Sequence, residues 1–327
     1  MKTLEVSRDV FRLAEVFTIS RGSRTTAEVL TATVSADGFS GCGECVPYAR
    51  YGETLDSVEE QIRSLSNDLA NGMDRIALQS ALPAGAARNA LDCALWDLQA
   101  KASGKPVWQL AGLPEPASVV SAYTLSLGDA ASMQAKASEH SHRPLLKIKL
   151  GSGAEDVERI QAVRRGAPQT TIIVDANEGW SCSEYEELAP VLLELGVAMV
   201  EQPLPSDDDD ALASMQRPLP VCADESCHDS DSLAAVAGKY DVVNIKLDKT
   251  GGLTEALVLR DKAMQQGYDV MVGCMVGSSL AMAPAVLVAQ GAKFVDLDGP
   301  LLLAEDRTPA LQFTGSVVTP AVAELWG

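Results

Sequence analysis

The sequence predicts an α/β protein with two parts: a (β/α)8 barrel of the TIM type, and an α+β unit formed from both termini, which is called the cap below. From about residue 117 onward, short β-rich runs alternate with helical stretches, with a new run starting roughly every 25 residues. The preceding residues place strand-like segments before helical ones, without that alternation. The cap is expected to comprise residues 1–116 with a C-terminal return over 301–327, and the barrel residues 117–300.

The N-terminal segment is expected to supply the strands and helices of the cap. Short strands are predicted within residues 1–40, where apolar and polar positions alternate around a hairpin turn at Asp37-Gly38. Apolar side chains then recur at helical spacing over residues 54–80. An alanine-rich stretch over residues 84–103 predicts a buried helix.

Eight short runs are expected to form the barrel strands. An open, doubly wound sheet would carry a glycine-rich phosphate turn after its first strand, and the sequence has none. The runs are SAYTLSL (121–127), LLKIKL (145–150), TIIVDAN (171–177), AMVEQP (198–203), PVCADES (220–226), VVNIKL (242–247), DVMVGCM (269–275) and KFVDLDGP (293–300).

Composition excludes several classes of protein. The net charge of −19 argues against a nucleic-acid or anionic-membrane partner, because both attract basic surfaces. No apolar run is long enough for a membrane span and no signal peptide is recognisable, so a cytoplasmic protein is expected. The seven cysteines are scattered, as is typical of a reducing compartment, and Cys42 and Cys45 lack the second pair of a zinc site. A homo-oligomer is compatible with these features.

Three carboxylates end three consecutive predicted strands: Asp175, Glu201 and Asp224. Carboxylates that converge at a barrel mouth repel one another unless a cation lies between them, and hard oxygen ligands suit Mg²⁺. One such residue alone could simply cap the helix after its strand. Three in register on adjacent strands instead predict a Mg²⁺ site that leaves positions for substrate oxygens.

Two lysines end the second and sixth predicted strands, Lys149 and Lys246, on opposite sides of a barrel mouth. Lysine is a poor base at its ordinary pKa, but nearby cations, here Lys147 and Mg²⁺, are expected to lower that pKa. Exposure to solvent, the usual fate of lysine, is expected for Lys249 and Lys262. It does not explain lysines inside runs as apolar as LLKIKL and VVNIKL.

The motifs KIKL, VDANEGW, VEQPLP, ADES and NIKLDKTGGLTEA, in that order, resemble the muconate-lactonizing subgroup of the enolase superfamily. The DLDGP motif near the end resembles the dipeptide epimerases of that subgroup. The stretches SRGSR, GECVPYARYGE and LPAGAARNALDCALWDL resemble the L-Ala-D/L-Glu epimerases of enteric bacteria. The resemblance extends from about residue 10 to residue 315. It implies a modified (β/α)8 barrel over which the α+β unit forms a capping domain. It also implies a cytoplasmic isomerase of cell-wall peptide recycling.

The resemblance also implies roles for individual residues. The substrate would be L-Ala-L-Glu or L-Ala-D-Glu, and its C-terminal α-carbon would be inverted by Mg²⁺-assisted proton transfer between two lysines. Asp175, Glu201 and Asp224 would bind Mg²⁺, and Lys149 and Lys246 would be the acid and base. The implied substrate-binding residues are Lys147 beside the substrate carboxylate, Asp296 and Asp298 at the dipeptide ammonium, Arg24 at the glutamate carboxylate, and Thr124.

Other reactions could use the same residue types. An o-succinylbenzoate synthase or a cycloisomerase needs no ammonium receptor, so the pair Asp296 and Asp298 argues against both. A metal-free Schiff-base lyase or aldolase would use one barrel lysine and would be insensitive to EDTA. A non-catalytic binding barrel would have no reason to retain both lysines and all three carboxylates.

Overall fold

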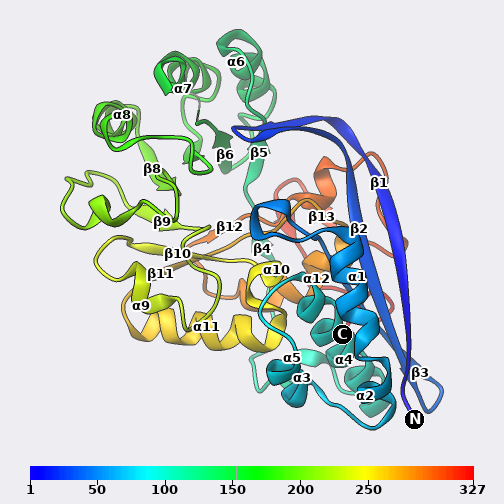
Figure 1. The fold of residues 1–327 in the computed structure, drawn as a ribbon. Helices are drawn as coiled ribbons and strands as arrows, with labels where there is room; N and C mark the ends of the chain where they lie inside the picture. The colour runs from blue at the N-terminus through cyan, green and yellow to red at the C-terminus, as the bar shows by residue number, and fades with distance from the viewer. Residues whose placement is uncertain (152) are drawn as a thin grey trace.

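The fold consists of an eight-stranded parallel sheet and a separate three-stranded antiparallel sheet (Figure 1). The computed structural model describes residues 1–151 and 153–327. In the parallel sheet each strand pairs with the next one along the chain. Its strands are β5 (Tyr123–Leu125), β6 (Leu145–Lys149), β7 (Thr171–Asp175), β8 (Val197–Glu201), β9 (Val221–Ala223), β10 (Val242–Ile245), β11 (Asp269–Val272) and β12 (Phe294–Val295).

The parallel sheet curls until its first and last strands meet. Ala122 N, just before β5, donates a hydrogen bond of 2.7 Å to Val295 O of β12. A single apolar cluster takes one buried side chain from each strand, or, for β5, from the residue directly before it. Such a layer of side chains is expected inside a barrel. The predicted barrel is therefore confirmed. The cluster contains Ala122, Leu145, Ile173, Met199, Cys222, Val242, Met271 and Phe294.

Helices follow the strands and cover the outside of the sheet. Ile148 and Ala176 face these helices, and both belong to the large apolar cluster between sheet and helices. Within the described ranges, none of the helices has the length and apolar character that crossing a membrane requires. The covering helices are α6 (Ala130–Glu139), α7 (Asp156–Gly166), α8 (Cys182–Glu194), α9 (Leu233–Val236), α11 (Leu253–Gln265) and α12 (Ser279–Val288).

The antiparallel sheet of the cap contains longer strands than the short ones expected. β1 (Thr3–Ile19) pairs with β2 (Gly22–Ala36) in two stretches separated by a register shift between Arg12 and Phe17. No glycine or proline interrupts β1, which allows a strand of this length. β3 (Phe39–Cys45) pairs with β2 across the Asp37-Gly38 turn, which confirms the predicted hairpin. The helices of the cap are α1 (Leu55–Ser64), α2 (Ser66–Ala70), α3 (Arg75–Ala81), α4 (Ala86–Ser103) and α5 (Val107–Leu110).

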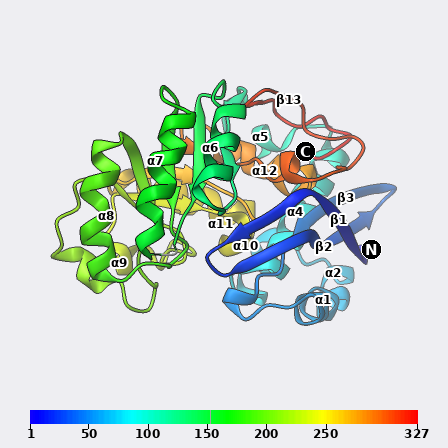
Figure 2. The same ribbon diagram turned by 90° about the horizontal axis from the view of Figure 1, so that it is seen from above.

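The cap contacts the barrel at both ends of the chain. Figure 2 shows the β1–β2 hairpin reaching from the cap toward the barrel, where Leu127 N donates to Thr18 O at 3.0 Å. After β12, the short helix η4 (Gly299–Leu302) leads the chain back to β1, and Ala304 N donates to Arg12 O at 2.8 Å. The strands β13 (Phe313–Thr314) and β14 (Val317–Val318) then form a small sheet with β4 (Val119–Val120). These contacts place the hairpin of the cap over the mouth of the barrel.

Candidate active site

A cavity lies between the C-terminal ends of the barrel strands and the cap. Residues of both the barrel and the cap hairpin line it. The two predicted site residues that do not line it, Asp175 and Glu201, are fully buried and contact Lys147, which does line it. The eight predicted residues that line the cavity are Arg24, Thr124, Lys147, Lys149, Asp224, Lys246, Asp296 and Asp298.

Strand register brings the charged groups of neighbouring strands together. Lys149 at the end of β6 lies opposite Asp175 of β7, and Asp175 lies opposite Glu201 of β8. Lys149 Nζ is 2.6 Å from Asp175 Oδ2. Lys147, two residues earlier on the same face, places its ammonium 3.0 Å from Asp175, 2.6 Å from Glu201 and 2.8 Å from Asp296.

The buried carboxylates differ in how well their charges are balanced. Burial favours the neutral form of Asp175, but Lys147 and Lys149 outweigh it and lower the pKa of this carboxyl. Burial likewise opposes the charge of Asp224, whose pKa is held well below its ordinary value by Lys246 and Lys249. Burial and the neighbouring charge of Asp175 raise the pKa of Glu201 to about 7. Of these three carboxylates, Glu201 is therefore the one whose ionised form is least favoured.

Lys246 follows β10 and precedes the short helix α10 (Leu247–Thr250). Its Nζ is 2.6 Å from Asp224 Oδ2. Burial alone would lower the pKa of Lys246, but the charge of Asp224, with those of Glu201 and Glu225, raises it instead. A cation bound by these carboxylates would oppose this effect, which is the lowering expected from Mg²⁺.

The prediction that Lys249 is exposed was wrong, since only 1% of this residue is accessible to solvent. Its ammonium donates to Asp224 O at 2.5 Å, Cys227 O at 2.8 Å and Asn244 O at 2.8 Å, and lies 2.8 Å from Asp224 Oδ1. α10 turns the chain back beneath the strand ends immediately after β10, which carries Lys249 inward. Lys262, by contrast, is exposed as predicted.

Two further residues that the sequence did not single out hold the carboxylates in place. Asn244 Nδ2 of β10 donates to Glu201 Oε1 at 2.7 Å. Gln202 Oε1 accepts a hydrogen bond from Asp224 N at 2.9 Å. Gln202, which directly follows Glu201, therefore helps to position Asp224. A polar amide inside the apolar run VVNI was the available signal for Asn244.

The three carboxylates form a donor set that suits a hard divalent cation. Within the described part of the chain, no group of three histidine, cysteine, aspartate or glutamate side chains is arranged to hold a metal. Glu201 Oε2 and Asp224 Oδ1 nevertheless accept no hydrogen bond, although lysine ammonium groups lie 2.6 and 2.8 Å away. Two buried carboxylate oxygens that accept no hydrogen bond therefore fit a cation such as Mg²⁺.

The predicted substrate-binding residues lie on two sides of the cavity. On the barrel side, Asp298 Oδ2 accepts from Thr124 N at 2.6 Å, and burial with the neighbouring Asp296 raises the pKa of Asp298 to about 7. On the cap side, the Arg24 guanidinium lies 5.5 Å from the Tyr48 ring centroid. Among the residues that the structure describes, this guanidinium has no ion-pair or hydrogen-bond partner. It is therefore available to an anionic ligand group.

Sequence profiles of two domains match most of the chain. The mandelate racemase/muconate lactonizing enzyme N-terminal domain matches residues 1–112, and the enolase C-terminal domain-like family matches residues 128–309. The L-Ala-D/L-Glu epimerase of Escherichia coli K12 is 47% identical over 96% of this chain and 98% of its own length. The N-acetyl-D-glutamate racemase of Pseudoalteromonas is 45% identical over 91% of this chain and 95% of its own length.

Solved structures agree with these relatives. An enolase family member from Agrobacterium tumefaciens with homology to dipeptide epimerases, solved with sodium, L-Ala-L-Glu and an ordered loop, is 52% identical. It superimposes with a TM-score of 0.98 and covers 100% of both chains. The dipeptide epimerase of Enterococcus faecalis, solved with Mg and L-Leu-L-Tyr, is 27% identical, with a TM-score of 0.91 and 98% of each chain covered. The chain therefore belongs to the mandelate racemase/muconate lactonizing enzyme family of the enolase superfamily.

Proposed function

We propose that this protein is an isomerase, a dipeptide epimerase that inverts the C-terminal α-carbon of L-Ala-L-Glu and L-Ala-D-Glu. The observation that carries the proposal is the placement of two buried lysines, Lys149 and Lys246, after the second and sixth of eight barrel strands and in the wall of one cavity. The names of the Escherichia coli relative and the L-Ala-L-Glu bound to the Agrobacterium structure support the substrate. We place the protein in the cytoplasm, in the recycling of cell-wall peptides.

Inversion needs proton removal from one face of a carbon and proton delivery to the other. Strands two and six lie on opposite sides of a barrel, so Lys149 and Lys246 approach a substrate between them from opposite faces. One lysine takes the α-proton while the other, protonated, donates to the opposite face. The configuration of the substrate decides which lysine acts as the base.

Asp175, Glu201 and Asp224 are the residues that would hold Mg²⁺. The chemistry of this donor set supports the assignment, as does the Mg in the Enterococcus faecalis structure. When bound, Mg²⁺ polarises the substrate carboxylate and stabilises the negative charge that develops on proton removal. Lys147, which contacts Asp175 and Glu201 in the structure, supplies a further positive charge beside that carboxylate.

The remaining residues are proposed to select the dipeptide. Asp296 and Asp298, with Thr124 beside them, would receive the ammonium group of the substrate, and Arg24 would receive the side-chain carboxylate of the C-terminal glutamate. We assign the cap to residues 1–116 with the return 301–327, and the barrel to residues 117–300.

A panel of dipeptides incubated with the protein in D₂O tests the proposal. L-Ala-L-Glu is expected to gain deuterium at the glutamate α-carbon and to be converted to L-Ala-D-Glu. EDTA is expected to stop both changes and added Mg²⁺ to restore them. The panel includes N-acetylglutamate, because the Pseudoalteromonas relative is named for that substrate. A lack of exchange across the panel would contradict an epimerase, and EDTA-resistant turnover with borohydride trapping would favour a Schiff-base enzyme instead.

Arg24→Ala is expected to remove the preference for glutamate. The value of kcat/KM for L-Ala-L-Glu should fall roughly 100-fold, because a charge-assisted contact with the substrate carboxylate is lost. The value for L-Ala-L-Leu should change by less than about threefold, since that substrate has no such carboxylate. Arg12→Ala, which removes an exposed arginine from β1, is the matched control. An unchanged ratio between the two substrates would show that Arg24 is not the receptor.

A further inference from the structure

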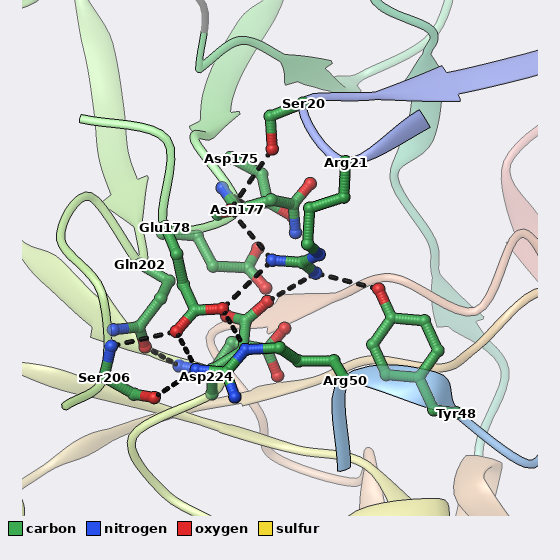
Figure 3. Close-up of polar contacts among 12 residues, drawn as sticks. Ser20, Arg21, Tyr48, Arg50, Asp175, Asn177, Glu178, Gln202, Ser206 and Asp224 are labelled. Carbon is green, nitrogen blue, oxygen red and sulfur yellow. Dashed lines mark hydrogen bonds and ion pairs between the residues drawn. The ribbon is translucent and has the colours of Figure 1, made fainter. Parts of the chain in front are cut away.

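Two segments of the cap form hydrogen bonds and ion pairs with one loop of the barrel (Figure 3). The first is the tip of the β1–β2 hairpin, which carries Ser20 and Arg21. The second is the turn after β3, which carries Tyr48 and Arg50. Both reach the loop that follows β7, and Figure 3 shows the two arginines converging on Glu178 from different elements of the cap.

The Glu178 carboxylate is the point where these contacts meet. Arg50 binds it with two hydrogen bonds, from Nε to Oε2 and from Nη2 to Oε1, both at 2.7 Å. Arg21 Nη1 lies 3.2 Å from Oε2, and Ser206 N donates to Oε1 at 2.9 Å. The Glu178 side chain is only 8% exposed, so water does little to screen these contacts. Burial opposes its charge, but Arg50 and Ser206 outweigh burial and lower the pKa of Glu178.

The loop that carries Glu178 has a strained backbone. Asn177 has φ 47° and Glu178 has φ 65°, both in the left-handed region that non-glycine residues rarely adopt. Such a conformation persists only where surrounding contacts impose it. Here Glu178 N donates to Gln202 O at 2.9 Å, while Arg21 Nη1 donates to Asn177 O at 2.8 Å. The cap therefore helps to hold the loop in its strained form.

The same loop touches a proposed catalytic lysine. Lys149 Nζ donates to Asn177 Oδ1 at 3.1 Å, next to its ion pair with Asp175. Arg21 in addition donates to Glu225 Oε1 at 2.8 Å, and Glu225 lines the cavity. A displacement of the cap hairpin would thus release contacts on both sides of the mouth. The hairpin also carries Arg24, which lines the cavity from the cap side.

We propose that Glu178 is a latch residue that keeps the cap closed over the cavity by holding Arg21 and Arg50 together. It is a positioning residue: it acts through the two cap segments and not on the reacting atoms. Among the described residues, the other side-chain hydrogen bond of Arg50 goes to Ser206 Oγ, at 3.0 Å. Without the charge of Glu178, the turn that carries Arg50 would therefore detach first. The latch itself does not depend on the reaction catalysed, but its effect on substrate retention rests on the proposed function.

Limited trypsin digestion of the ligand-free protein tests the latch directly, because the two cap segments contain Arg21, Arg24 and Arg50 as cleavage sites. In Glu178→Gln, cleavage at these sites is expected to accelerate on the order of tenfold relative to the unsubstituted protein. The matched control is Glu187→Gln, an exposed glutamate of α8, which should leave the rate unchanged. Equal cleavage of the cap segments in both variants would overturn the latch.

Arg50→Gln provides an independent second variant, because Arg50 lies on a partly exposed turn where a substitution leaves the core intact. Cleavage after Arg21 and Arg24 should again accelerate, and the double variant with Glu178→Gln should add little, since both substitutions break the same contact. Multiplicative effects of the two substitutions would contradict a shared latch.

Steady-state kinetics separate the latch from the proposed function. With L-Ala-L-Glu, Glu178→Gln is expected to raise KM about tenfold while kcat changes less, because an opened cap weakens binding before it affects proton transfer. If Glu178→Gln speeds cleavage of the cap segments but the unsubstituted protein turns over no dipeptide, the latch is supported and the proposed epimerase function is contradicted. If the protein is an active epimerase and Glu178→Gln leaves cleavage unchanged, the latch is contradicted and the epimerase function is supported.

Discussion

Replacing either Lys149 or Lys246 by alanine is expected to abolish inversion of L-Ala-L-Glu. A positioned acid or base contributes roughly 10²- to 10⁴-fold to a rate, and inversion by two opposed lysines needs both. The fold should survive each substitution, because each carboxylate partner keeps a second lysine. Asp175 retains Lys147 at 3.0 Å, and Asp224 retains Lys249 at 2.8 Å.

Isotope exchange in D₂O distinguishes two bases from one. Each single variant should still exchange the α-proton of one epimer, the one whose proton faces the remaining lysine, without converting it to the other. The two variants should show opposite preferences between L-Ala-L-Glu and L-Ala-D-Glu. Lys262→Ala, which removes an exposed lysine, is the control and should behave as the unsubstituted protein. Inversion at full rate in either Lys149→Ala or Lys246→Ala would rule out the two-lysine scheme.

The barrel was predictable because its strands have a simple and regular sequence pattern. Strands buried on both faces read as short apolar runs, and functional groups follow at their C-terminal ends. Lys149, Asp175 and Glu201 each end such a run, and parallel register then places them side by side. The regular spacing of the runs thus predicted both the fold and the composition of the charged cluster.

The contacts between cap and barrel have no comparable sequence pattern. Arg21 and Glu178 are 157 residues apart in the chain, and nothing in the local sequence of either indicates the other. The positive φ of Asn177 and Glu178 was equally hidden, because neither residue is a glycine that would mark such a turn. Contacts of this kind depend on how the cap and the barrel meet in three dimensions, which sequence periodicity does not record.

Lys249 shows how a local pattern can mislead. A lysine in the polar stretch after a strand is usually solvated, but here its ammonium replaces water with three backbone carbonyl oxygens. Two glycines that follow, Gly251 and Gly252, have φ of 74° and 108° and allow the tight turn after α10. The sequence displays these glycines, but only the three-dimensional arrangement shows which acceptors the turn brings to the lysine.

Lys249→Met is expected to destabilise the protein by about 3–5 kcal/mol, the range observed when one partner of a buried charge pair is removed. Methionine fills similar space but leaves the carbonyl oxygens of Asp224, Cys227 and Asn244 without their donor. Urea unfolding followed by circular dichroism measures the change. Lys262→Met, at an exposed position on α11, should shift the free energy of unfolding by less than about 0.5 kcal/mol.

The two lysines that contact Asp224 should therefore fail in different ways when replaced by methionine. Lys246 lines the cavity, where water can reach Asp224 once the ammonium is gone, so its loss should remove activity with little change in stability. Lys249 is fully buried and bonded to backbone on three sides, so its loss should appear first as a lower free energy of unfolding. Comparable stability losses in both variants would show that Lys246 is also a structural residue. A Lys249→Met protein of unchanged stability would mean that the three carbonyl contacts of Lys249 make no net contribution to the free energy of unfolding. The role of Lys249 would then lie in the charge that it places beside Asp224.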